Sequence, residues 1–193
     1  MRRIGVAAFL AAALLAGRVS ADPPGDASID PHIWRVAESG DARHVQSGLA
    51  CPLQFLGYTR HDLHVYDHGG FDVSCDYARP GADATVYLTR FTPRVPLDKL
   101  YEDAKRSFLQ VRASLHPSLR REFHPDDGGL AWNAAIYDDD RGMSDMIWIG
   151  DLDGWMLEYR LTYPTDDEDR AFADLAAFTD AVKASAGAQL GGI

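Results

Sequence analysis

Apolar and polar residues alternate with a period of two in two stretches of the chain. In residues 71–77 the odd-numbered positions are Phe, Val, Cys and Tyr, and the positions between them are polar. In residues 155–163 the odd-numbered positions are Trp, Leu or Tyr, with Glu158, Arg160 and Thr162 among those between. Because side chains point alternately to opposite faces of a strand, both stretches are predicted strands with one buried face.

Five further stretches have strand-like composition and are separated by short turns. The turns are rich in Asp, Gly and Pro, as hairpin connections are. We predict strands at residues 61–66, 84–91, 119–123, 130–137 and 143–150. Since neighbouring strands joined by tight turns pair antiparallel, the pattern predicts a three-strand meander followed by a four-strand one.

A period near 3.6 predicts two main helices, at about residues 97–113 and 166–186. In the first, Leu97, Leu100, Ala104 and Phe108 share one face. The second opens on Thr165-Asp166-Asp167-Glu168, which matches a capping box, and is expected to end at Gly187. A third, short helix is expected at residues 31–38, because it begins with a proline and carries apolar residues at helical spacing.

These elements predict one α+β domain at residues 31–187, in which an antiparallel sheet of about six to seven strands packs against the two main helices. The element order over residues 55–186 resembles the PsbP-like fold, which implies an antiparallel sheet packed between helices. The resemblance is one of topology, with no motif residue to carry over, so it implies nothing about activity. The Ala- and Asp-rich composition is also similar to that of uncharacterised exported bacterial proteins.

The first residues predict export. Met1-Arg2-Arg3, a short apolar run and the small residues before Asp22 are typical of a signal peptide, residues 1–21, cleaved after Ala21. Residues 22–30 are predicted to be a disordered leader, and residues 188–193 a frayed C-terminus. No second long apolar stretch follows, so we expect no transmembrane segment in the mature chain and a periplasmic or secreted location. The alternative is an uncleaved membrane anchor.

The net charge of the chain limits the kinds of partner that we expect it to bind. The 193 residues carry 19 Lys and Arg against 29 Asp and Glu, a formal net charge of −10. Cleavage removes Arg2, Arg3 and Arg18, which leaves 16 basic residues against 29 acidic ones and a net charge of −13. An acidic chain is not expected to bind nucleic acid or anionic membranes, which attract basic patches.

The two cysteines, Cys51 and Cys75, are expected to form one disulfide, because an exported chain folds in an oxidising compartment. The alternative is a reactive or metal-binding thiol pair, but there is no C-x-x-C motif.

Histidines suggest a possible metal site. His61, His64 and His68 lie close together in sequence, and imidazole is a common zinc and copper ligand. In an extended segment His64 and His68 share a face, whereas His61 points away. The alternative is three solvated histidines.

Further candidates are Trp132 and Arg160, as part of a ligand or partner surface, although core packing is the alternative for Trp132. The chain has no G-x-S-x-G, no H-E-x-x-H, no glycine-rich phosphate loop and no calcium-loop register. We therefore predict no cofactor and a non-enzymatic binding module whose partner is an envelope protein or small ligand. A metal-binding protein is the first alternative, and a hydrolase with an unrecognised site is the second.

Overall fold

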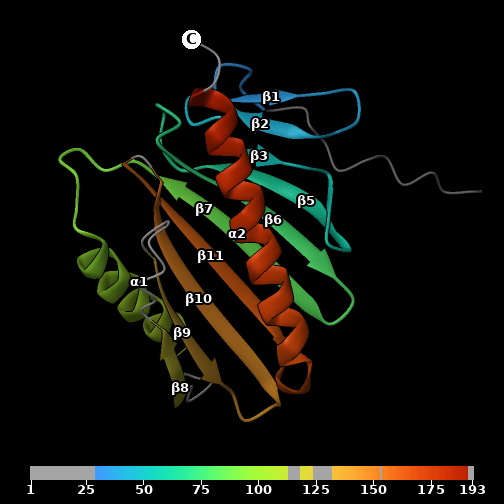
Figure 1. Cartoon of the computed structure of the whole chain (residues 1–193), viewed down its shortest axis with the longest axis vertical. Helices are drawn as coiled ribbons and strands as arrows, with labels where there is room; N and C mark the ends of the chain where they lie inside the picture. The colour runs from blue at the N-terminus through green and yellow to red at the C-terminus, as the bar shows by residue number, and fades with distance from the viewer. Residues whose placement is uncertain (1–28, 113–117, 124–131, 153, 191–193) are drawn as a thin grey trace, which may run out of the picture.

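The computed structural model describes residues 29–112, 118–123, 132–152 and 154–190. These residues form an α+β structure with one large antiparallel sheet, a separate three-stranded sheet and two long helices (Figure 1). The fold class predicted from the sequence, including the two main helices and the disulfide, is confirmed.

The large sheet has eight strands in the order β4-β5-β6-β7-β11-β10-β9-β8. Its strands are β4 (Gln54–Phe55), β5 (Tyr58–Val65), β6 (Asp72–Arg79), β7 (Ala82–Thr89), β8 (Ser118–Phe123), β9 (Trp132–Asp138), β10 (Met143–Leu152) and β11 (Trp155–Pro164). The first meander ends at β7, and the chain then crosses through α1 (Leu97–Arg112) to the far edge. The second meander returns from that edge, so β11 pairs with β7 at the centre.

The two faces of the large sheet have different neighbours, and we name them by their helices. The α2 face lies beneath α2 (Glu168–Leu190), which crosses the sheet with its C-terminal end near the three-stranded sheet (Figure 1). On β11 the predicted alternation is confirmed, because Leu157, Tyr159 and Leu161 are buried in the core of the α2 face. Glu158 and Arg160 therefore lie on the opposite side, the α1 face.

The three-stranded sheet is fastened to the α2 face by long-range links. It consists of β1 (Trp34–Val36), β2 (Ala42–His44) and β3 (Ala50–Cys51). Cys51 is disulfide-bonded to Cys75 of β6, and Arg60 donates to the Cys51 carbonyl. The buried His44 ring has its Nε2 atom 2.9 Å from the Gly70 carbonyl oxygen. Gly70 has φ of 71°, a conformation that glycine adopts without strain.

A buried ion pair fastens α2 to the same face. Arg79 of β6 donates to Asp174 of α2 at 2.7 Å, and both side chains are less than one-tenth exposed. The Tyr58 hydroxyl donates to the same carboxylate at 3.2 Å, while the Arg79 guanidinium lies over the Tyr58 ring. A carboxylate with two buried donors fixes the position of α2 along the strands.

Helix α1 covers only part of the α1 face. Its buried side chains, among them Leu100 and Phe108, pack on Tyr137, Ile147 and Ile149 of β9 and β10. Polar side chains occupy this face on β6, β7 and β11, as the pairing of Ser74 with Tyr87 and of Tyr87 with Glu158 shows. The α1 face is thus apolar at one end and polar at the other.

Three local predictions are wrong. Residues 31–38 form no helix: Ile33 and Trp34 donate to the Asp30 carbonyl in a single turn, and the chain then extends into β1. A segment this short cannot offset the cost of helix nucleation, so strand pairing prevails. The capping box is absent because Thr165 lies in a 3₁₀ turn and accepts a hydrogen bond from Ser144. Helix α2 also continues through Gly187 to Leu190.

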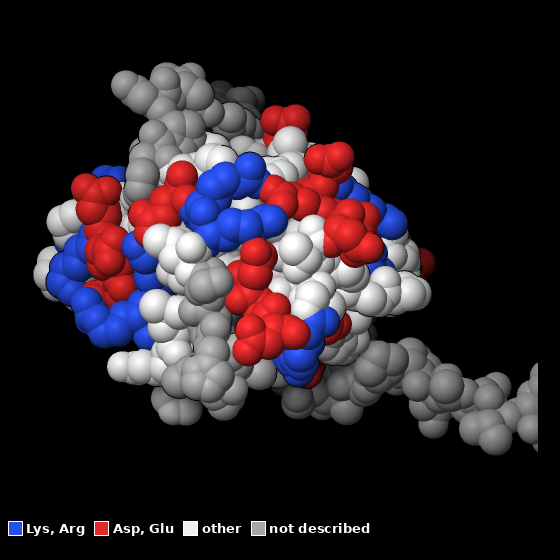
Figure 2. All heavy atoms as spheres, turned by 90° about the horizontal axis from the view of Figure 1, so that it is seen from below, with Lys and Arg blue, Asp and Glu red and all other residues white. Residues whose placement is uncertain are grey.

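The surface carries charges of both signs. Figure 2, which views the molecule from below, shows acidic and basic side chains next to one another on that face. At the start of α2, Glu168 pairs with both Arg120 and Arg121 of β8. None of the helices in the described part of the chain is long and apolar enough to cross a bilayer. The predicted signal peptide, most of the leader and residues 191–193 lie outside the described residues.

Candidate functional site

An apolar pocket of about 110 Å³ lies where the three-stranded sheet, the large sheet and α2 meet. We call it the disulfide pocket, since Cys51 is part of its wall. Its lining residues are Leu49, Ala50, Cys51, Pro52, Phe55, Tyr58, Tyr77, Ala84, Val86, Tyr159, Phe178 and Ala181. All of these are aliphatic or aromatic residues or the disulfide cysteine, so the pocket offers a surface for an apolar ligand.

Strand alternation positions the floor of this pocket. Ala84 and Val86 are both on the α2 face of β7, and Tyr159 lies on the same face of the neighbouring β11. The small side chain of Ala84 leaves space between larger neighbours. Phe178 of α2 stacks on Tyr159 with ring centroids 4.5 Å apart and closes one side.

The tyrosine hydroxyls add no charge to the pocket. Burial raises the pKa of Tyr159, and burial likewise raises the pKa of Tyr58 and of Tyr77. A phenol whose pKa is raised stays protonated and neutral at every physiological pH. No lining residue is a carboxylate, a histidine, a lysine or an arginine. The pocket can therefore bind by apolar contact, but it holds no general base or nucleophile for a reaction.

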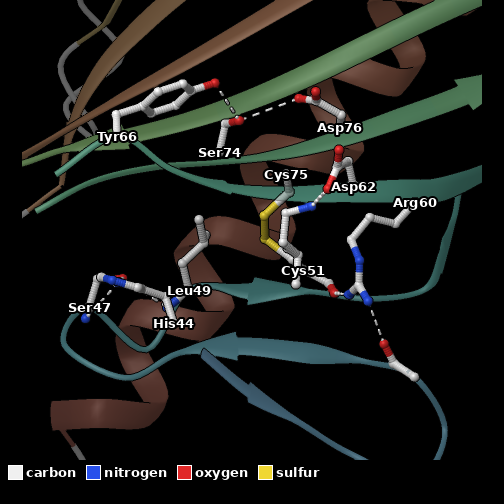
Figure 3. The surroundings of a disulfide bond; sticks show 12 residues. His44, Ser47, Leu49, Cys51, Arg60, Asp62, Tyr66, Ser74, Cys75 and Asp76 are labelled. Carbon is white, nitrogen blue, oxygen red and sulfur yellow. Dashed lines mark hydrogen bonds between the residues drawn. A yellow bond between two sulfur atoms is a disulfide. The ribbon is translucent and has the colours of Figure 1, made fainter. Parts of the chain in front are cut away.

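Figure 3 shows how β6 separates two environments. Cys75 points toward the three-stranded sheet and its disulfide partner, with Leu49 and His44 nearby, whereas Ser74 and Asp76 point to the opposite side. There the Tyr66 and Ser74 hydroxyl oxygens are 3.1 Å apart, and Ser74 Oγ is 3.4 Å from an Asp76 oxygen. One strand thus contributes a disulfide cysteine to the α2 face and a polar network to the α1 face.

The three candidate histidines occupy different surroundings. His64 Nε2 is 3.0 Å from Asp76 and 3.5 Å from Asp62, His61 fills the irregular position between Arg60 and Asp62, and His68 lies in the turn before β6. In the described parts of the chain, no group of three or more His, Cys, Asp or Glu side chains could hold a metal ion. The metal hypothesis stays a prediction, which thermal unfolding with zinc would test.

Trp132 and Arg160, the two residues proposed for a ligand surface, lie on opposite faces of the sheet. Trp132 packs on Trp148, with ring centroids 6.0 Å apart, at the edge of the α2-face core. Arg160 is on the α1 face, where its guanidinium lies 4.8 Å from the centre of the Tyr87 ring. One ligand cannot contact both residues from the same side of the sheet.

Sequence reasoning missed the disulfide pocket. Its walls come from segments as far apart as Leu49 and Ala181, and a hollow between distant segments has no local signature. The inward face of residues 155–163 was predicted, but alternation cannot show whether the space above that face is filled. The pairing of Cys51 with Cys75 was the one available signal for the location.

Comparisons with known proteins give a likeness of fold. A scan against family models finds no match, and neither does a comparison with curated proteins. Among solved structures, the chain is similar to the solution structure of cyanobacterial PsbP (CyanoP) from Synechocystis sp. PCC 6803, with a TM-score of 0.45 and 17% sequence identity. The likeness covers 83% of this chain and 94% of that one.

Proposed function

We propose that this protein is an exported, non-enzymatic binding module of the cell envelope that holds the apolar end of a small molecule in the disulfide pocket. The ligand group is an alkyl chain end or a single aromatic ring. The observation that carries the proposal is the pocket itself, about 110 Å³ in volume and lined by apolar and aromatic residues.

The cost of leaving the pocket empty supports a ligand. Protein interiors are packed to the density of organic crystals, and voids larger than a water molecule are few. The pocket is partly open to solvent, so its apolar lining stays in contact with water until a ligand covers it, and covering it contributes about 25 cal/mol per Å². Water is a poor occupant because it needs two to four polar partners. A bound apolar group removes this cost and gains contacts with Tyr159, Phe178 and Val86.

Export is supported by the first residues and by the disulfide. The basic start, the apolar run and the small residues up to Ala21 suit a signal peptide, and disulfides persist in oxidising compartments. The pocket wall includes Cys51, so its shape depends on a bond that such a compartment maintains.

The test uses two probes, ethylbenzene for an aromatic ring and dodecanoate for an alkyl chain. Binding of either at about a hundred times its dissociation constant would add about 2.7 kcal/mol to the free energy of unfolding, or roughly 5–10 °C. Amide NMR shifts on the mature, oxidised protein should concentrate at residues 49–52, 84–86 and 178–181. If neither probe shifts the unfolding temperature or these amides, the proposal is wrong.

A matched pair of variants makes the test specific. Ala84→Leu fills the pocket from its floor and should abolish probe binding while raising the free energy of unfolding by about 0.5–2 kcal/mol, as cavity filling does. Ala78→Leu is the same substitution on β6, but Ala78 lies on the α1 face, two residues from Asp76. This variant should leave probe binding intact. Equal probe affinity in the two variants would contradict the assignment.

A further inference from the structure

On the α1 face, four flat groups lie in a row across the sheet. His64 stacks near Tyr66 with ring centroids 5.9 Å apart, Tyr66 near Tyr87 at 6.2 Å, and the Arg160 guanidinium lies 4.8 Å from the Tyr87 ring centre. We call these four groups the stacked row. Its first step, from His64 to Tyr66, follows β5, and the next two steps cross β6 and β7 to reach β11; Tyr66 is 53% exposed. An exposed tyrosine held by its neighbours is a preformed surface for a ligand ring.

The row ends at a pocket beside α1. This second pocket, about 190 Å³ in volume, is lined by Thr85, Tyr87 and Arg160 of the sheet and by Phe108 and Val111 of α1. It is distinct from the disulfide pocket because it lies on the other face of the sheet. Its exposed walls are mostly polar, with Asp145 and Thr162 of the sheet beside Thr85 and Arg160, and convergent polar groups of this kind are typical of a site for a small polar ligand.

The polar groups along the row both donate and accept hydrogen bonds. Arg160 donates, the Asp76 carboxylate accepts, and the hydroxyls of Tyr66 and Thr85 do both, whereas the side chains of Ser74 and Glu158 are buried. Sugar rings match this combination, because hydroxyl groups around the rim of the ring donate and accept while its two faces carry C–H groups. Each step of the row, 4.8 to 6.2 Å, is comparable to one sugar ring in a chain.

Charge disfavours the other small ligands. The one arginine of the row is already paired with Glu158, a buried carboxylate, and further carboxylates lie nearby at Asp76 and Asp72. A phosphate or carboxylate ligand would meet more negative than positive charge. An amine would have to compete with Arg160 for Glu158 and with His64 for Asp76.

We infer that the stacked row and the pocket at its end bind a neutral oligosaccharide, with one sugar ring in the pocket and the following rings on Tyr87 and Tyr66. The inference is independent of the disulfide pocket, so either proposal can fail without the other. Ala84→Leu should accordingly leave saccharide binding unchanged.

The experiment titrates the mature, oxidised protein with three neutral tetrasaccharides, cellotetraose, maltotetraose and chitotetraose, and follows amide NMR shifts and binding heat. At least one should bind, with shifts at Tyr66, Tyr87 and Arg160. Tyr66→Ala should weaken that binding at least tenfold, and Tyr66→Phe, which keeps the ring, by no more than about threefold. Phe71→Ala, an exposed aromatic residue that stacks on Trp155 away from the row, is the matched control and should change nothing.

Three results would overturn the inference. The first is no response to any of the three saccharides. The second is saccharide binding that Tyr66→Ala does not weaken although the variant keeps its unfolding temperature. The third is tighter binding of spermidine or of glucose 6-phosphate than of every neutral saccharide, since the site would then select charge.

Discussion

The two faces of the large sheet are formed by alternate residues of the same strands, and they differ in how they are covered. The α2 face is closed by a disulfide, a buried ion pair and two covering elements, and it keeps one small apolar hollow. The α1 face is covered only where β9 and β10 present apolar side chains, and elsewhere it carries aromatic and charged groups. Long-range links hold the α2 face together, whereas the polar part of the α1 face is held by the pairing of its strands.

Because of this difference, we expect the α2 face to determine the stability of the fold and the polar part of the α1 face to determine polar ligand binding. Substitutions on the α2 face should change the free energy of unfolding, because they break links between elements far apart in the chain. Substitutions of the exposed residues on the polar part of the α1 face, such as Tyr66, remove groups that already contact solvent, so they should change ligand binding more than folding.

The largest effect is expected from the ion pair under α2. Asp174→Ala leaves the Arg79 guanidinium, whose side chain is 4% exposed, without its main partner. Breaking a buried pair from one side costs about 3–5 kcal/mol, measurable by urea unfolding. Asp180→Ala, on an exposed position of the same helix, should cost less than about 0.5 kcal/mol.

A double variant shows whether the cost is the unpaired charge. Arg79→Met with Asp174→Leu removes both charges and keeps much of the volume, so it should recover most of the loss. Equal destabilisation in the single and double variants would mean that the pair holds α2 by geometry and not by charge.

The disulfide should rank next. Cys51 and Cys75 are 24 residues apart, and the loop-entropy model gives about 3.5 kcal/mol for closing such a loop. Replacing both cysteines by Ala should lower the free energy of unfolding by about this amount and weaken the binding of apolar probes. Saccharide titration of the same variant, at a temperature where it stays folded, is the control. Unchanged probe affinity would show that the disulfide does not shape the pocket.

The sequence predicted which residues share a face of the sheet better than it predicted the contacts between distant segments. Alternation on β11 placed Leu157, Tyr159 and Leu161 on one face, because a strand with one buried side must alternate. It could not pair Arg79 with Asp174, which are 95 residues apart, or find the hollow over Ala84. Such contacts depend on where α2 docks, and that position is set by the whole fold. The Thr165 cap failed for a related reason, since Pro164 continues a strand up to that point.

His44 should make the α2 face sensitive to acid. The Gly70 carbonyl can only accept, so Nε2 carries the proton and Nδ1 accepts from Ser47. Burial lowers the pKa of His44 from its ordinary 6.5, although the hydrogen bond to Gly70 and the nearby charge of Asp67 act to raise it. The unfolded chain then binds the proton more tightly, so the free energy of unfolding falls as pH drops below about 6.5. His44→Gln should cost about 1–3 kcal/mol at pH 7.5 and flatten this part of the pH profile.

A second histidine, His61, provides the control for this prediction. His61→Gln, at an exposed position, should leave both the stability and its pH dependence unchanged. A wild-type profile that stays flat between pH 7.5 and 5, after subtraction of the His44→Gln profile, would show that the buried ring does not resist protonation.

Glu158 should give the α1 face a smaller dependence of the opposite sign. Burial raises the pKa of Glu158 from its ordinary 4.5, although Arg160 beside it acts to lower it. The folded chain therefore holds this proton more tightly than the unfolded chain does. Its contribution to stability is present below the folded pKa and is lost as pH rises through that value. Glu158→Gln cannot ionise, so relative to wild type its free energy of unfolding should rise between pH 4.5 and 7.5, by no more than about 1 kcal/mol. Glu38→Gln, at an exposed position, should show no such trend. If the Glu158→Gln difference instead falls with pH, Arg160 outweighs burial, and the polar part of the α1 face owes stability as well as binding to its charged pair.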